Sequence, residues 1–193
     1  AADRELAFAK ADLDSLKQNF NLDAVDEQTA LSIKMLEEDV KRAEEGLKWR
    51  HYAYEITQLQ GVHNDLPAFL INVHKIDSLS DAEAYISRLQ KLEGVFNQTL
   101  DDLKKSEELG AIPPYFTFHY VTDDLKNFIA GLDKKDASNI LLDDFSNKVE
   151  ALSIDKTQKD SLKATAANVL KTTVKASYQK LLDYWLQLEP KAK

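Results

Sequence analysis

Three polar residues flank a glycine at a point where the helical pattern of the chain is interrupted. Gln60 precedes Gly61, and His63 and Asp65 follow it, two residues apart. An imidazole and a carboxylate held close together can orient each other, exchange a proton or hydrogen-bond a polar ligand. We therefore predict that Gln60, His63 and Asp65 face a substrate channel. The alternative is that they serve local capping and turn formation.

Arg88 is a fourth candidate for substrate binding. It follows Ile86 by two positions in a segment with a strong helical pattern. Its planar guanidinium can bind a carboxylate through two parallel hydrogen bonds, and that carboxylate can belong to a substrate or to a neighbouring helix. Loss of folding stability on substitution by alanine would indicate a buried bridge. Loss of activity alone would indicate a substrate contact.

The motifs of nucleophilic and metal-dependent catalysis are absent from the sequence. None of the four histidines belongs to a His-Glu-x-x-His or Glu-x-x-His pattern, which would place two ligands on one helical face; they are His51, His63, His74 and His119. There is no cysteine and no Gly-x-Ser-x-Gly turn, and the five glycines are too widely spaced for a phosphate-binding loop. We predict no catalytic residue, no metal site and no cofactor in this chain.

Charge and hydropathy exclude several classes of partner. The chain has 193 residues and a net charge of -8, so its surface repels phosphates and nucleic acid is not an expected partner. No apolar run approaches the roughly 20 residues that span a bilayer. The start at Ala1-Ala2, without methionine, indicates a shortened chain or a mature amino terminus after signal removal. The second case predicts an exported protein.

Apolar residues recur at spacings of three and four along most of the chain, as in amphipathic helices with one buried face. The expected helices cover residues 6–20, 26–49, 65–73, 80–109, about 121–132, 138–152 and 155–188. Residues 52–61 form an irregular connector in this prediction. Residues 115–120 form an aromatic-rich loop, whose side chains either line a groove or fill space over the core.

Capping residues define the ends of several expected helices. Ser80 and Glu83 have the spacing of a capping box, which opens the longest of the central helices. Gly110, followed by Pro113-Pro114, should end that helix. Pro67 should lie in the first turn of the helix that begins near Asp65, where its missing amide hydrogen costs nothing.

These elements predict an all-α fold, an irregular antiparallel bundle of six to seven helices, some of them long. The helices are expected to form a single domain over residues 1–193. No repeat of fixed period is visible, which disfavours a solenoid.

Four segments also occur in an order that is typical of one bacterial family. They are residues 58–70 (QLQGVHNDLPAFL), 81–89 (DAEAYISRL), 110–114 (GAIPP) and 174–182 (VKASYQKLL). On these segments the chain resembles the domain-of-unknown-function 885 family, from about Leu22 onward. Ser177 departs from the family pattern, where a small-residue or proline-alanine step is expected.

The resemblance implies a longer, exported bacterial protein, periplasmic or lipid-anchored, with a fold similar to long-helix zinc carboxypeptidases. It implies that this chain is the amino-terminal helical region, which forms one wall of a substrate channel for peptides. The His-Glu-x-x-His helix and its zinc would then belong to the carboxy-terminal, catalytic-like region, which is the expected partner of this chain. The chain alone would not be an enzyme, whereas the full-length protein would be a zinc metallopeptidase.

A different function is compatible with the same sequence. The chain could be a self-contained, non-enzymatic protein-interaction module, whose aromatic connector docks a partner. A reading frame that stops near Lys193 would favour this module. A His-Glu-x-x-His motif downstream would favour the peptidase.

Overall fold

The computed structural model describes residues 2–21, 24–133 and 139–193, and every regular element in them is a helix. The all-α prediction is thereby confirmed. The chain divides into two compact units, Ala1–Ala53 and Tyr54–Lys193. Each unit is described by itself.

The first unit is a helical hairpin made of α1 (Ala2–Asn19) and α2 (Glu27–Gly46), followed by a 3-10 helix, Leu47–Tyr52. Leu6, Leu13 and Val40 form its small core. The hairpin is antiparallel, because Lys10 pairs with Glu44 and Lys17 pairs with Glu37, each at 2.7 Å. Asp26, where the second helix was expected to begin, is the N-cap of α2, and Phe20, at the end of the first expected helix, is 55% exposed.

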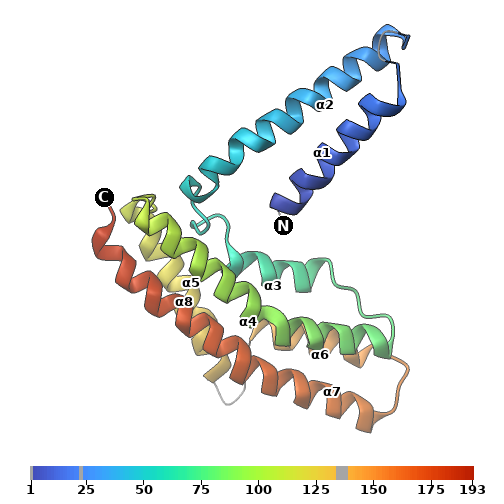
Figure 1. Cartoon of the computed structure of the whole chain (residues 1–193). Helices are drawn as coiled ribbons and strands as arrows, with labels where there is room; N and C mark the ends of the chain where they lie inside the picture. Colours follow the sequence, from blue (N-terminus) through green and yellow to red (C-terminus); the bar gives the residue numbers. More distant parts are fainter. Residues whose placement is uncertain (1, 22–23, 134–138) are drawn as a thin grey trace. The chain divides into compact units, whose positions relative to one another are not determined.

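The second unit contains six α-helical segments: α3 (Val62–Asn72), α4 (Leu79–Glu108), α5 (Tyr115–Asp133), α6 (Ile140–Glu150), α7 (Lys156–Val169) and α8 (Lys175–Leu188). A π turn, Leu170–Val174, joins α7 and α8 into one continuous helix. This long helix packs against α4, while α5 packs along α8 and α6 along α7 (Figure 1).

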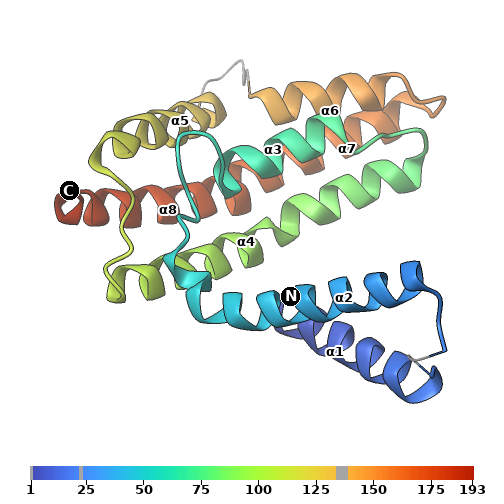
Figure 2. The same ribbon diagram turned by 90° about the horizontal axis from the view of Figure 1, so that it is seen from above.

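Chain direction reverses between α3 and α4, between α4 and α5, and between α6 and α7 (Figure 2). In the same view α5 and α6 run one after the other in a single direction, opposite to the α7–α8 helix. α3 packs on both α4 and α6. The result is the irregular bundle that the unequal helix lengths predicted.

The start of α4 differs from the prediction by two residues. Ser78, and not Ser80, is the N-cap: its hydroxyl oxygen accepts from the amide of Asp81 at 3.3 Å and donates to the Asp81 carboxylate at 2.7 Å. The predicted capping box is therefore wrong: Asp81, three residues after the cap, accepts from the Ser78 hydroxyl and from the amide of Asp77.

The end of α4 agrees with the prediction. Gly110 has a φ of 74° and its amide donates to the carbonyl of Glu107 at 2.9 Å. The amide of Ala111 donates to the carbonyl of Ser106 at 2.8 Å. Together these bonds form a Schellman motif, in which glycine takes the left-handed position without strain.

Two further boundaries correct the sequence-based expectation. α5 begins at Tyr115, so the aromatic segment expected to be a loop is the first turns of a helix. The carbonyl of Pro114 accepts from both the amide and the hydroxyl of Thr117, which fixes this start. Asn139 caps α6, and Ser138, where that helix was expected to begin, lies outside the described residues.

α3 starts earlier than expected, and this places Pro67 inside the helix and not in its first turn. A residue at position 67 of a regular helix would donate its amide hydrogen to the carbonyl of His63, but proline has none. The hydroxyl of Tyr178, in α8, donates to that carbonyl at 2.7 Å. The unused helical acceptor is thus satisfied from a neighbouring helix.

Candidate functional site

The first turn of α3 is fixed by Gly61. Its φ of 138° and ψ of 164° belong to a region that is accessible almost only to glycine. A β-carbon at this position would lie 3.0 Å from Nδ1 of His63 and 3.2 Å from Cγ1 of the buried Ile56. The backbone at Gly61 therefore packs directly on the His63 ring and sets its position.

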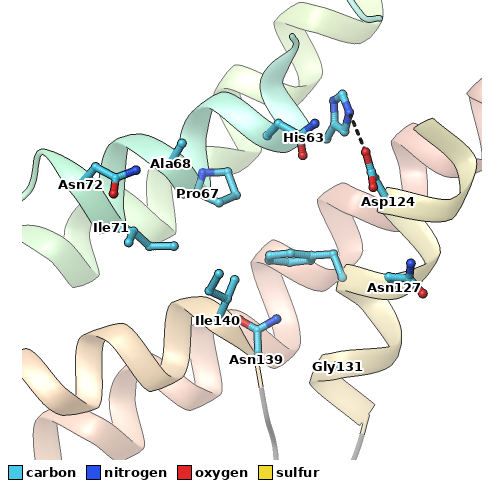
Figure 3. Close-up of a pocket in the computed structure, with 12 residues that line it drawn as sticks. His63, Pro67, Ala68, Ile71, Asn72, Asp124, Asn127, Gly131, Asn139 and Ile140 are labelled. Carbon is cyan, nitrogen blue, oxygen red and sulfur yellow. Dashed lines mark ion pairs between the residues drawn. The ribbon is translucent and has the colours of Figure 1, made fainter. Parts of the chain in front are cut away.

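A pocket of about 660 Å³ lies between α3, α5 and the start of α6 (Figure 3). Its described polar lining consists of His63, Asn64, Asn72, Asp124, Asn127 and Asn139. The apolar lining includes Pro67, Ile71, Phe128 and Ile140. Amide side chains offer both donors and acceptors, so this lining can match the peptide groups or polar head of a ligand.

His63 is 3% exposed, and neither ring nitrogen has a hydrogen-bond partner within the described structure. Its Nε2 lies 4.0 Å from Oδ2 of Asp124, too far for a hydrogen bond (Figure 3). Burial lowers the pKa of His63 below its usual value, against the opposing effect of the Asp124 and Asp65 carboxylates. The imidazole is therefore neutral at pH 7, and it leaves the charge of Asp124 uncompensated.

The predicted channel residues do not come together around this pocket. His63 lines it, but Asp65 caps the start of α3, where its carboxylate accepts from the amide of Gly61 at 3.0 Å. Gln60 is exposed, and its backbone carbonyl accepts from the amide of Thr57 at 2.9 Å in a turn. The geometry of Gln60 and Asp65 is that of the capping and turn alternative; a substrate role for either stays a prediction.

Arg88 lies at a different place, on α4 beside α3. Its Nη1 hydrogen-bonds Nδ1 of the buried His74, and its guanidinium carbon lies 5.8 Å from the centre of the Phe69 ring. Nε2 of His74 donates to the carbonyl of Asp81 at 3.1 Å, so the ring is a neutral acceptor toward Arg88. In the described part of the chain Arg88 pairs with no carboxylate, and it borders an apolar depression of about 180 Å³.

Lys148 holds the other end of α3 in place. From α6 its ammonium donates to the carbonyls of Leu70, Ile71 and His74, at 2.8 to 3.0 Å, and it pairs with Asp144 at 2.8 Å. The carbonyls of Leu70 and Ile71 belong to the last turn of α3, where no helical donor follows, and that of His74 lies just after the helix. Gly61 and Tyr178 thus fix the start of the helix that forms one wall of the pocket, and Lys148 fixes its end.

The sequence-based prediction missed most of the residues on the opposite wall. Asp124 belongs to the Asp123-Asp124 pair, which by itself is typical of a solvated helical face. A clue was available in α5, where Asp124, Asn127 and Gly131 follow each other at helical spacing on one face. What that face opposes depends on the tertiary packing of α3, which no local pattern encodes.

Comparison with protein families places the chain in one of them. The model of a family described as bacterial proteins of unknown function, DUF885, matches residues 1–193. The chain belongs to the DUF885 family. This confirms the family resemblance deduced from the ordered segments.

A solved structure supports the fold of this DUF885 chain. It is the crystal structure of "the putative lipoprotein from Colwellia psychrerythraea", with a TM-score of 0.68 and 20% sequence identity. The match covers 72% of this chain and 24% of the other, so the chain spans about a quarter of the length of that protein. A search of the curated proteins found no match.

The described residues form neither a metal-binding group nor a membrane-spanning helix. Among the described residues no group of three or more His, Cys, Asp or Glu side chains is placed to bind a metal ion. None of the helices in the described ranges of this DUF885 chain has the length and apolar character that crossing a membrane requires.

Proposed function

We propose that this chain is a non-catalytic helical region of a longer, exported, zinc metallopeptidase-like protein, and that it forms part of the wall of that protein's substrate channel. The observation that carries the proposal is the pocket between α3, α5 and α6. Its lining combines several amide side chains, one carboxylate and a neutral buried imidazole with an apolar floor. Such a surface suits an extended peptide, whose backbone needs both donors and acceptors and whose side chains need apolar contacts.

The relation to a much longer protein of similar fold supports this proposal. A region that corresponds to about a quarter of the Colwellia protein can supply a wall, while other parts supply the reacting groups. That protein's description as a lipoprotein is compatible with export or lipid anchoring of the present one.

Zinc does not fit the residues present here. A catalytic zinc site requires three protein ligands and an open position for water. The sequence lacks a His-Glu-x-x-His pair, and the described structure brings no such ligand set together. In the proposed protein any zinc is therefore bound outside this chain, and no chemical step is assigned to the residues described here.

The proposal can be tested by separating binding from turnover. The chain of residues 1–193 should neither hydrolyse a peptide library with added zinc nor bind zinc stoichiometrically. In the same sample, peptides at millimolar concentration should shift the backbone NMR signals of Asn64, Asn72 and Asn127. Turnover together with stoichiometric zinc binding would overturn the assignment of catalysis to another region.

Two matched substitutions test whether peptides bind in this pocket. Asn127→Ala removes an amide from the pocket, whereas Asn97→Ala removes an exposed amide of α4 that is not part of the lining. Peptide binding should weaken only in the first variant. Equal binding by both variants, or no peptide-induced shifts at all in the wild type, would contradict a peptide-binding wall.

A second candidate function is a helical protein-interaction module. It is favoured by the exposed aromatic side chains at the start of α5, where Tyr115, Phe116 and Tyr120 are each more than half exposed. Aromatic residues of this kind dominate many protein interfaces. If the reading frame ends near Lys193, or if Phe116→Ser abolishes a protein interaction without affecting peptide binding, the module is the better description.

A further inference from the structure

Asp124 is the charged residue in the described lining of the pocket. Of the described lining residues it carries the only formal charge at neutral pH, since the remaining polar ones are amides and a neutral imidazole. Its side chain is 46% exposed, so a ligand can reach it. Among the described residues it has no hydrogen-bond partner and pairs with no lysine or arginine; the neutral His63 ring has its Nε2 4.0 Å away.

Two features keep this carboxylate available. A β-carbon at Gly61 would lie 3.0 Å from Nδ1 of His63, so the Gly61 backbone lies directly against the ring, whose Nε2 is 4.0 Å from Oδ2 of Asp124. Asp123, its neighbour in sequence, instead lies 3.6 Å from the exposed His119 on the same helix and does not line the pocket. A negative charge that has no partner among the described residues, beside several amide oxygens, is a site that favours a cation with several N–H donors.

The other lining residues indicate what kind of ligand the cationic group belongs to. Asn127 lies three residues after Asp124 on the same face of α5, so its amide can share a bound donor. Phe128, Pro67, Ile71 and Ile140 supply apolar surface in the same cavity. A protonated amine on an aliphatic chain can pair with the Asp124 carboxylate and also contact the apolar surface. An anionic group would instead be repelled by that carboxylate.

We propose that the Asp124 end of this pocket is a subsite for a primary ammonium group of the ligand, either the α-amino group of a peptide or the side chain of a lysine. This inference rests on the proposed peptide-binding function and narrows it to peptides with a free amine. It also assigns to Asp124 the recognition of charge, and to the amide and apolar residues the contacts that any peptide would make.

The experiment uses the chain of residues 1–193 and four probes, with dissociation constants measured by NMR titration. Trialanine amide is compared with its N-acetylated form, and N-acetyl-lysine methylamide with N-acetyl-norleucine methylamide. At least one charged probe should bind about tenfold more tightly than its neutral partner, because a charge-assisted hydrogen bond contributes at least 1.4 kcal/mol, which is a factor of ten. The pair that shows the difference identifies the source of the ammonium group.

Matched variants attribute the difference to one carboxylate. Asp124→Asn should abolish the preference for the charged probe, and Asp123→Asn should retain it. Because the wild-type preference should also decrease as salt is raised from 0.01 to about 1 M, the test does not depend on the variant folding normally. Equal effects of the two variants, or a preference that is insensitive to salt, would overturn the subsite.

The outcomes separate the subsite from the broader function. If acetylated and free peptides shift the same pocket signals with equal affinity, the ammonium subsite is wrong and the peptide-binding wall stands. If no probe shifts these signals, both are wrong.

Discussion

Tyr178 supplies from α8 the hydrogen bond that Pro67 cannot supply within α3. The hydroxyl donates to the carbonyl of His63 at 2.7 Å, and this carbonyl is the one that a residue with an amide hydrogen at position 67 would bond. Burial raises the pKa of Tyr178, so the hydroxyl is protonated and remains a donor at neutral pH. Removing this hydroxyl should therefore leave a buried acceptor unsatisfied.

Tyr178→Phe should lower the free energy of unfolding by about 1 to 3 kcal/mol, the cost of an unpaired buried polar group. In a Pro67→Ala background the loss should be smaller, because alanine restores the helical donor. A double-mutant cycle in urea measures this coupling. Tyr184→Phe, which removes a hydroxyl bonded to Glu107, is the control, and its cost should not depend on residue 67. Strictly additive effects of Tyr178→Phe and Pro67→Ala would refute the compensation.

Gly61 should tolerate no side chain. Gly61→Ala combines a backbone conformation that is nearly restricted to glycine with a 3.0 Å contact to the His63 ring, so unfolding free energy should fall by about 1 to 3 kcal/mol. Gly94 is the matched control, because it lies within α4 with nothing near its missing side chain. Gly94→Ala should stabilise by roughly 0.5 to 1 kcal/mol. Thermal denaturation should move the two variants in opposite directions, and a shift in the same direction would contradict this account.

Lys148 should contribute more to stability than other paired lysines of the chain. Lys148→Met leaves the carbonyls of Leu70, Ile71 and His74 at the end of α3, and also Asp144, without the lysine donor, and about 2 kcal/mol of unfolding free energy should be lost. Lys163→Met removes a lysine that pairs with the largely exposed Glu150, and little change is expected. Chemical denaturation compares the two. Hydrogen exchange should also accelerate in α3 for the first variant alone, and unchanged exchange there would count against the capping role.

Acidification should destabilise the second unit through His74. Burial lowers the pKa of His74, and the charges of Arg88 and Lys148 lower it further, against a hydrogen bond from its ring to Asp81 that raises it. As the pH falls, His74 is therefore protonated in the unfolded chain, near the usual histidine pKa of about 6.5, before it is protonated in the folded chain. Stability should decrease as pH falls through that value, until the folded pKa is reached. His74→Gln can keep both hydrogen bonds, and it should flatten part of this pH dependence of the melting temperature. An unchanged slope would show that His74 is not responsible.

The fold could largely be predicted from the sequence, because the residues that begin and end its helices act locally. Asp26, Gly110 and Asp155 each act within a few residues, and each ends or begins a helix where predicted. The misplaced cap at Ser80 shows the limit of such patterns, since Ser78 has an equivalent hydroxyl and an acidic residue three positions later. The local pattern therefore does not choose between the two serines.

The pocket was much harder to predict from the sequence, because its residues come from three helices. His63 was identified from its place beside Gly61, but Asp124 is separated from it by the whole of α4. The local sequence of α5 places Asp124 on one helical face with Asn127, but it does not show that this face lines a cavity while Asp123 pairs with an exposed histidine. The distinction exists only after α3 has packed over α5 and α6.

The π turn at Leu170–Val174 has a consequence for how this chain can change in evolution or by design. Within this turn Leu170 and Val174 are both buried. The turn holds one residue more than an α-helical turn, so every downstream side chain is rotated by about 100° relative to a regular helix. Deleting one residue here would leave the helix intact but would turn Tyr178 and Trp185 out of the core. In an alignment of relatives, a single-residue gap at this position would therefore mark a reorganised pocket and not a neutral loop variation.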